Sequence, residues 1–461
     1  MMRSDKITPE QLRTLVLQGN KSKIQEIGSG YHPLSIAESL ASLTAPEIWT
    51  FLSNSESNSA ADIFVELDDD IQQTLIKELK LSDFVWILSA MSHDERADLM
   101  AQLPEETQKQ VMPALALDER EDIRKLAAYP EGTAGSIMTS DFTVIGVDLT
   151  VDEAIKEIRE QAEGRETIYY VYVVNKQKRL VGMCTLKNLI LAKSGARIRE
   201  IMRTDLIFGY TGDDQEDIAR KIAKYDILAL PVVDHKHVLV GIVTHDDALD
   251  VIQQEQTEDF EKFMAITGSH KGEGYLKTPF WVHTKNRASW LVVLAFLGLV
   301  SGWILHYYEA TLSQAIILAL YLPMIADTGG NAGSQSATVI VRALTLNEIT
   351  PKDLFQVLFK ELKISICLAI LLGILALGKV YFLSYGMELP FGMTIGSIAG
   401  VIAIALGLQV VTSTLMGAFL PLFVTRFNLD PAVVASPAIT TLVDISGLVI
   451  YFFIATKLLG L

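Results

Sequence analysis

Hydrophobic and polar positions divide this chain into a polar half and an apolar half that meet near residue 287. Residues 5–128 carry leucines at helical spacing between short cap signals, as in SHDERADLM from Ser92, with no alternating strand pattern. This pattern predicts an all-α superhelical N-terminal domain over residues 1–128, in which short helices stack as in a solenoid.

An internal repeat follows the helical segment. The stretch SIMTSDFTVI from Ser136 returns as EIMRTDLIFG from Glu200, and the longer segment from Val171 returns from Leu230. Each copy predicts an extended segment, a helix, a β-hairpin and a second helix. One copy cannot bury its sheet alone, so we expect two α/β domains that pack as a pair. Their predicted bounds are residues 129–199 and 200–256.

A charged helix is predicted next, from Asp247 to Gly268, and residues 257–286 form a linking (plug) helix before the apolar half. The apolar half breaks into five segments, each longer than the roughly 20 residues that cross a bilayer. We therefore expect a five-helix transmembrane domain over residues 287–461, with a break in the second segment at Pro323 and the glycines after it. The segments are 288–308, 312–342, 364–384, 391–424 and 431–458.

Positive residues predict the orientation of these segments. They gather before the first segment and between the second and third, which places both regions in the cytoplasm. The protein is then a multi-pass protein of the cell (plasma or inner) membrane with a cytoplasmic N-terminus and an external C-terminus. The residues are Lys271, Lys277, Lys285, Arg287, Arg342, Lys352, Lys360 and Lys363.

Charge is distributed unevenly between the halves. Residues 287–461 hold eight basic and eight acidic residues, so the net charge of −16 belongs to the part before them. An acidic surface disfavours nucleic acid, whose phosphates need a basic face, and favours cations as partners. Cys184 and Cys367 lie in a predicted strand and a predicted membrane helix, so no disulfide framework is expected.

Two polar features interrupt the apolar half. Asp444 lies inside TTLVDISGLVIYFF, where a central aspartate costs roughly 2.5 to 3.5 kcal/mol on insertion scales. The stretch ADTGGNAGSQSAT allows backbone carbonyls to line a water-filled cavity, or small residues to pack helices closely. The pore-lining candidates in this stretch are Asp327, Gly329, Gly330, Asn331 and Gln335.

On the motifs GGNAGSQSAT and DPAVVASPAITTLVDISGLVIYF, and on the order of its domains, the whole chain resembles the MgtE family of magnesium channels or transporters. The repeat resembles a pair of cystathionine-β-synthase (CBS) domains. The resemblance implies that Asp444 binds hydrated Mg²⁺ in the pore of a homodimer, with Ser436 and Thr440 on the ion path. Ser436 stands where the better-known family pattern has asparagine.

The resemblance also implies regulation by Mg²⁺ itself. At high cytosolic Mg²⁺ the ions bridge acidic faces of the N-terminal, CBS and linking segments and close the pore. The implied sensor carboxylates are Glu216, Asp226, Asp250, Glu255, Glu258, Asp259 and, beside the membrane, Asp430. CBS pairs also bind adenine nucleotides, which implies ATP as a regulator near Tyr170, Lys187 and Asn188.

Two other classes of function compete with a Mg²⁺ channel. A divalent-cation transporter coupled to protons or sodium would use Asp444 or Asp327 for its driving ion. A membrane receptor for a nucleotide would need the CBS pair but neither Asp444 nor the glycine-rich stretch. The sequence contains no Walker A motif and no paired histidine spacing, so an enzyme is not expected.

Overall fold

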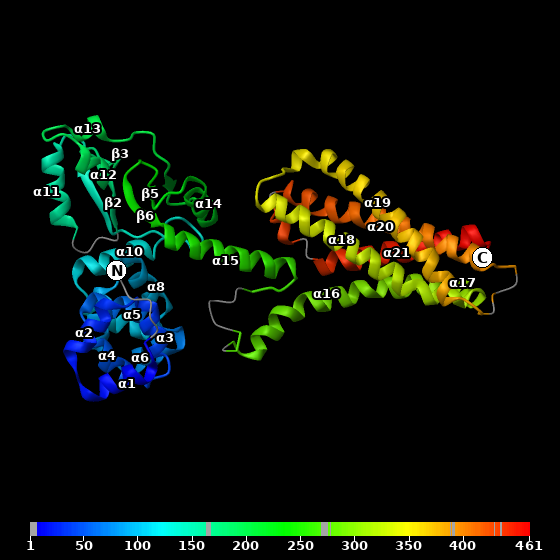
Figure 1. The fold of residues 1–461 in the computed structure, drawn as a ribbon, viewed down its shortest axis with the longest axis horizontal. Helices are drawn as coiled ribbons and strands as arrows, with labels where there is room; N and C mark the ends of the chain where they lie inside the picture. Colours follow the sequence, from blue (N-terminus) through cyan, green and yellow to red (C-terminus); the bar gives the residue numbers. More distant parts are fainter. Residues whose placement is uncertain are drawn as a thin grey trace. The chain divides into compact units, whose positions relative to one another are not determined.

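The chain folds into two units in a computed structural model (Figure 1). The structure describes residues 7–162, 167–268, 275–276, 278–387, 389, 392–427, 429–433 and 436–461. Unit 1 comprises Met1–Glu255 and unit 2 comprises Gln256–Leu461. Each unit is described by itself below.

The first part of unit 1 is helical, as predicted. Threonines cap two of these short helices, Thr8 before α1 and Thr44 before α4, and Leu12, Phe51 and Phe64 lie in their shared core. No strand occurs among the residues described from 7 to 126. The helices are α1 (Pro9–Gln18), α2 (Lys21–Gly30), α3 (Pro33–Leu40), α4 (Ala45–Leu52), α5 (Ser57–Val65), α6 (Asp69–Glu78), α7 (Leu81–Ala90), α8 (His93–Gln102), α9 (Glu105–Val111), the 3₁₀ helix η1 (Met112–Ala114) and α10 (Leu117–Leu126).

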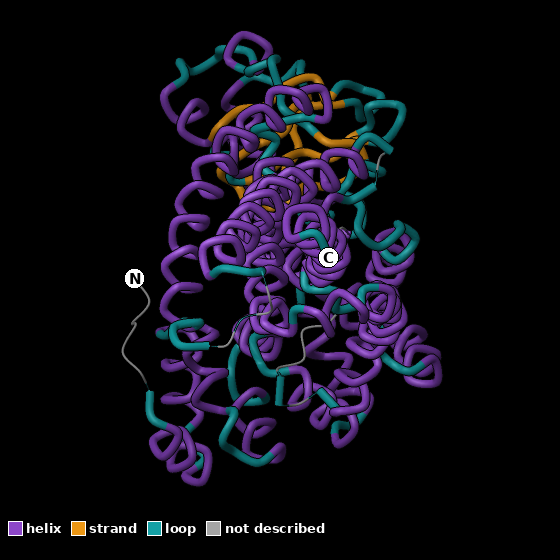
Figure 2. The backbone as a smooth tube through the Cα atoms, turned by 90° about the vertical axis from the view of Figure 1, so that its right-hand side faces the viewer, coloured by secondary structure: helices purple, strands orange, loops and turns teal. Residues whose placement is uncertain are grey.

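The repeat gives two sheets of the same topology, whose strands are orange in Figure 2. In each sheet the first two strands are parallel and the last two form an antiparallel hairpin. The copies pack as a pair: the Tyr172 hydroxyl donates to the Ala229 carbonyl at 3.0 Å in their shared core. The elements are β1 (Phe142–Gly146), α11 (Val151–Gln161), β2 (Thr167–Val174), β3 (Leu180–Thr185), α12 (Leu186–Leu191), α13 (Ile198–Ile201), β4 (Gly209–Tyr210), α14 (Gln215–Tyr225), β5 (Ala229–Val233) and β6 (Leu239–Thr244).

The charged helix is α15 (His245–Phe263), which starts two residues before its predicted start and ends five residues before its predicted end. The boundary between the two units falls inside this helix, after Glu255. The predicted linking segment 257–286 holds the end of α15 and the start of α16. Within that segment, Lys271 and Lys277 lie outside the described residues.

Unit 2 is a helical membrane domain. Its elements are α16 (Phe280–Tyr307), α17 (Glu309–Gln314), the 3₁₀ helix η2 (Ile316–Tyr321), α18 (Leu322–Thr345), η3 (Pro351–Asp353), α19 (Leu354–Leu383), α20 (Ile395–Thr425), η4 (Pro431–Val433) and α21 (Ser436–Leu459). Four stretches in the described residues are long and apolar enough to cross a membrane: Phe280–Tyr307, Pro351–Leu383, Ile395–Thr425 and Ser436–Leu459. α18 is long enough but carries many polar and glycine residues, so the count of five crossings stays a prediction.

The predicted break in the second segment is only partly right. η2 gives way to α18 just before Pro323, but α18 then runs without interruption through Gly329, Gly330 and Gly333. The reason is close packing: a side chain on Gly417 of α20 would overlap the carbonyl oxygen of Gly333. The glycines therefore bring helices together, and the prediction of irregular backbone at this point is wrong.

Candidate functional site

Asp444 lies on α21 where that helix meets α18. A Cβ atom placed on Gly330 would lie 3.9 Å from Oδ1 of Asp444 and 3.0 Å from Cγ2 of Thr440, so the missing side chain of this glycine leaves room for both. Asp327, also on α18, is close enough for its charge to repel that of Asp444. The structure thus brings both predicted intramembrane carboxylates to one helix junction.

A short series of hydroxyl groups leads along α21 to Asp444. Ser436, Thr440 and Asp444 are four residues apart and so share one side of the helix. Ser334 of α18 bridges the first two: its Oγ accepts from Ser436 Oγ at 3.1 Å and lies 3.2 Å from Thr440 Oγ1. We did not predict Ser334 from the sequence, although its position seven residues after Asp327 places it on the same helix face.

The outer side of α18 carries an exposed polar stripe. Asp327, Asn331 and Gln335 are four residues apart, and all three are exposed. Gly329 and Gly330 are buried against neighbouring helices instead. A carboxylate and two amides at this depth need water or another protein surface, because lipid offers them no hydrogen bonds. Carboxylate, amide and hydroxyl oxygens are also the ligands that hard cations such as Mg²⁺ prefer.

The predicted sensor carboxylates on α14 and the first part of α15 have partners within unit 1. Glu216 forms an ion pair with Arg220, and Glu255 accepts a hydrogen bond from Gln215 at 2.7 Å. Asp226 ends α14 in the left-handed conformation, with φ of 51°. These residues lie on adjoining segments of the second CBS copy, but no carboxylates of this group are brought together around one point in the described residues.

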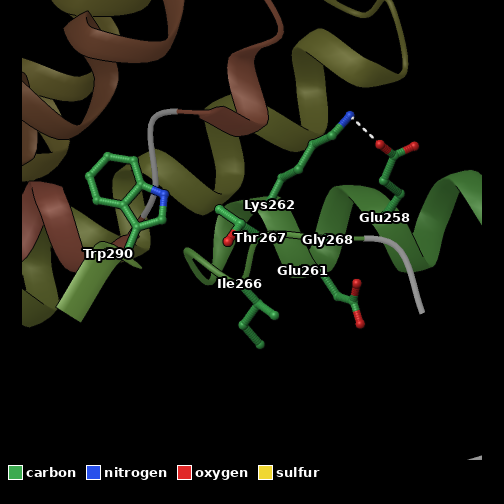
Figure 3. Close-up of a pocket in the computed structure, with 7 residues that line it drawn as sticks. All are labelled: Glu258, Glu261, Lys262, Ile266, Thr267, Gly268 and Trp290. Carbon is green, nitrogen blue, oxygen red and sulfur yellow. Dashed lines mark ion pairs between the residues drawn. The ribbon is translucent and has the colours of Figure 1, made fainter. Parts of the chain in front are cut away.

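In unit 2, Lys262 lies between two predicted sensor carboxylates. Its Nζ is 2.9 Å from Glu258 Oε1 and 3.1 Å from Asp430 Oδ2. Burial disfavours the ammonium charge, but the hydrogen bonds and charges of these carboxylates outweigh that effect and raise the pKa of Lys262 above its usual range. Figure 3 shows Lys262 reaching Glu258 beside a cavity of about 290 Å³, which Glu261 and Trp290 also line. Asp259 lies next to Glu258 on α15.

A group of carboxylates that the sequence did not reveal lies where the helical domain meets α15 within unit 1. We call it the acidic interface. Asp94 repels Asp98 on its own helix and Asp247 on α15, while Asp250 repels Glu66, which directly follows α5. Its members are Asp62 on α5, Glu66 at the end of that helix, Asp94, Glu95 and Asp98 on α8, and Asp247 and Asp250 on α15.

The environment of the acidic interface disfavours the charged form of its carboxylates. Burial raises the pKa of Glu95 to about 7 and that of Asp247 to about 7, and the charge of Asp94 adds to both shifts. Oδ1 of Asp94 is buried and has no hydrogen-bond partner within the described ranges. No three acidic, histidine or cysteine side chains converge on one ion position among the described residues. These carboxylates therefore lie close together but do not form a complete ion-binding site.

The predicted nucleotide residues lie around the start of α12. Tyr170 of β2 pairs with Thr185 of β3, and the Thr185 hydroxyl accepts from the backbone of Asn188 at 3.1 Å. Lys187 is adjacent, so the three predicted residues share one small region. The proximity of these residues is compatible with a ligand site, and ATP binding stays a prediction.

Comparison with known proteins covers nearly the whole chain. Residues 322–454 match the family model MgtE, described as a divalent cation transporter, residues 31–132 match the MgtE intracellular N domain, and residues 134–195 and 198–254 match the CBS domain. The chain is 34% identical over 456 residues to the magnesium transporter MgtE of Thermus thermophilus, covering 97% of this chain and 98% of that protein.

Two further comparisons agree with the match to the MgtE family models. The magnesium transporter MgtE of Bacillus subtilis is 34% identical over 406 residues, covering 88% of this chain and 87% of that protein. A crystal structure of the soluble part of a magnesium transporter superposes with a TM-score of 0.51 at 32% identity, covering 54% of this chain and 99% of that one.

Proposed function

This chain belongs to the MgtE family of divalent cation transporters, and we propose that it is a Mg²⁺ channel that cytosolic Mg²⁺ closes. The observation that carries the proposal is the position of Asp444, a carboxylate at a helix junction that also holds Asp327 and the hydroxyls of Ser334 and Thr440. Because it belongs to this family, the chain is a multi-pass membrane transport protein. Membership of the family therefore disfavours the enzyme, the receptor and the proton- or sodium-coupled alternatives.

The chemistry of Mg²⁺ suits this junction. Mg²⁺ loses water reluctantly, so one or two carboxylates that hold it through its water shell let it pass, whereas a complete protein cage would retain it. Hydroxyl groups of Thr440 and Ser436, nearer the cytoplasmic start of α21, then bind the same waters after the ion has left Asp444. A doubly charged ion also offsets the repulsion between Asp327 and Asp444.

A second copy of the chain completes the path. The exposed stripe of Asp327, Asn331 and Gln335 cannot face lipid without cost, but two stripes facing each other across a two-fold axis enclose a water-filled pore. In this homodimer two Asp444 side chains serve one ion. The proposed membrane is the cell (plasma or inner) membrane, with the N-terminus in the cytoplasm and the C-terminus outside.

The acidic interface supports the closing mechanism. When cytosolic Mg²⁺ is scarce, the charges of Asp94 and Asp247 repel each other and loosen the contact between the helical domain and α15. When Mg²⁺ is abundant, ions bridge the carboxylates of the interface and of the sensor residues, and this compaction closes the pore. Asp250 belongs to both groups, and Glu258 and Asp430 extend them to unit 2. ATP, bound near Tyr170, Lys187 and Asn188, is proposed as a second regulator.

The decisive experiment replaces the pore carboxylate. We expect Asp444→Ala to abolish Mg²⁺ uptake in cells that lack other Mg²⁺ transport and to abolish currents in reconstituted membranes, because the charge that α21 offers the ion is lost and Asp327 alone remains at the junction. The matched control is Glu309→Gln, which removes an exposed carboxylate of the same unit whose Oε2 lies 3.2 Å from His306 Nδ1. Unchanged uptake in Asp444→Ala would refute the pore assignment. Flux that requires a proton or sodium gradient would favour the coupled transporter.

A further inference from the structure

Gln409 on α20 is a polar side chain that is fully buried inside the membrane domain. Its Nε2 donates a hydrogen bond of 2.8 Å to the carbonyl oxygen of Val443, the residue directly before Asp444. That carbonyl also accepts from Ser446 Oγ at 2.9 Å, so two side chains converge on the backbone that carries Asp444. α20 is thus tied to α21 at the level of the proposed ion site.

Two glycines on neighbouring helices make room for this side chain. A Cβ atom on Gly329 of α18 would lie 2.5 Å from Gln409 Nε2, and a Cβ atom on Gly447 of α21 would lie 2.7 Å from the same atom. Neither distance is tolerated by real side chains, so any larger residue at either position would displace the amide. Gly447 is one helical turn after Asp444, and Gly329 directly precedes Gly330, which faces Asp444.

Gln409 occupies this position although one of its two polar side-chain atoms lacks a hydrogen-bond partner among the described residues. Oε1 of Gln409 is buried and has no hydrogen-bond partner in the part of the chain that the structure describes. A leucine or methionine would fill the same space without that cost, and a buried polar atom without a partner calls for an explanation. The hydrogen bond to Val443 is the one feature that such an apolar residue could not supply.

We infer that Gln409 is a positioning residue that sets the rotation and depth of Asp444 relative to α18. This inference rests on the proposed function, because it matters only if Asp444 meets the ion. The amide, wedged between Gly329 and Gly447, fixes the spacing of three helices at one level. Through the Val443 carbonyl it holds the carboxylate at the place where a hydrated ion of one size passes. Gln409 therefore governs ion affinity and discrimination between Mg²⁺ and Ca²⁺.

The first test separates affinity from folding. Gln409→Met keeps the length of the side chain but cannot donate a hydrogen bond. We expect it to raise the half-saturating Mg²⁺ concentration on the order of tenfold, as for other residues that orient a metal ligand, and to weaken discrimination against Ca²⁺. Maximal flux and the amount of protein in the membrane should stay close to those of the unchanged protein. An unchanged half-saturating concentration and unchanged discrimination would overturn the inference.

The second test uses the steric fit. Gly329→Ala should displace the Gln409 amide, because its new methyl group collides with that amide, and should therefore raise the half-saturating Mg²⁺ concentration about as much as Gln409→Met does. Combining the two substitutions should add little to either one alone, because both act through the same hydrogen bond. Gly378→Ala is the control, because nothing lies within 4 Å of its added carbon. Fully additive effects in the double variant would also overturn the inference. Asp444→Ala, run alongside, distinguishes the two failures: if it still transports, the proposed function fails, and if it does not, only the role of Gln409 fails.

Discussion

The junction around Asp444 and the acidic interface of unit 1 use the same chemical group in opposite ways. At the junction, carboxylates are few and the helices around them are packed so closely that Gly330, Gly333 and Gly417 leave no room for side chains. At the acidic interface, carboxylates are many, and burial and mutual repulsion disfavour their charges. A rigid place with few carboxylates suits passage of an ion, whereas a dense group of buried carboxylates suits a response to ion concentration.

The largest effect is expected from a substitution that disturbs the close helix packing at the junction around Asp444. Gly417→Ala should abolish transport and lower the amount of folded protein, because its methyl group would overlap the backbone carbonyl of Gly333. Uptake and membrane content should be measured together. Gly400→Ala on the same helix is the matched control, since nothing lies within 4 Å of its added carbon. A fully active Gly417→Ala protein would show that the close contact of α18 and α20 is unnecessary.

The second-largest effect is expected when charge is removed from the acidic interface while the junction around Asp444 is left unchanged. Asp94→Asn combined with Asp247→Asn should raise the internal Mg²⁺ concentration that half-closes the channel by about tenfold, since two bridging carboxylates are lost. Because the same substitutions remove the repulsion that loosens the contact, the current at low Mg²⁺ should also fall, and the dependence of the current on Mg²⁺ should flatten. Patch-clamp recording at a series of internal Mg²⁺ concentrations measures both quantities. Glu105→Gln, at an exposed carboxylate of α9, should change neither. The same half-closing concentration in the double variant would contradict the gating role of this interface.

A smaller effect follows from the raised pKa values of Glu95 and Asp247, both about 7. Carboxyl groups in an unfolded chain titrate near pH 4, so the folded protein binds these protons more tightly than the unfolded protein does. The resulting stability is complete below that pH and is lost as the pH rises through 7. Without Mg²⁺, the purified chain should therefore melt about 2 to 4 °C higher at pH 6 than at pH 8.

Mg²⁺ and protons should compete in that measurement. Added Mg²⁺ should raise the melting temperature more at pH 8, where the carboxylates are charged, than at pH 6. The Asp94→Asn and Asp247→Asn double variant serves as the comparison and should lose part of this dependence on pH, because burial still raises the pKa of Glu95. An equal Mg²⁺ effect at both pH values would mean that the ion acts elsewhere.

The smallest effect concerns Lys262. Lys262→Gln should lower the internal Mg²⁺ needed for closure by about two- to threefold, because the ammonium no longer neutralises Glu258 and Asp430. The same substitution at Lys109, which pairs with Glu105 at the surface of α9, is the control and should have no effect on closure. Closure that needs more Mg²⁺ in Lys262→Gln would mean that the lysine supports the closed state.

Local and repeated features were predictable from the sequence. The helical domain, the paired α/β copies and the helix from α15 follow from periodicity, caps and self-similarity, which act over short stretches. Asp444, Thr440 and Ser436 were identifiable as site candidates because an acidic residue in an apolar helix is costly and the flanking motif resembles a known family.

The features that were missed depend on segments far apart in the sequence. Asp62, Asp94 and Asp247 each look like an ordinary surface residue until α5, α8 and α15 are packed together. Gln409 lies in an apolar helix, and its partners are on α18 and α21, far away in sequence. The glycines of α18 misled us for a related reason: a glycine permits irregular backbone and close packing equally well, and only the neighbouring helix decides between them.

The position of the unit boundary inside α15 has a mechanical consequence. A flexible linker would let each unit turn freely, but nineteen residues of continuous helix, with no glycine or proline, resist twisting because every residue is hydrogen-bonded to the next turn. Twisting of α15 about its own axis is therefore costly along its whole length. The helix ends at Phe263, after which Ala265 and Gly268 adopt φ values of 60° and 102°. In the gating mechanism that we propose, α15 therefore links the carboxylates of its first half to Glu258 and Lys262 through continuous helix and not through a flexible segment.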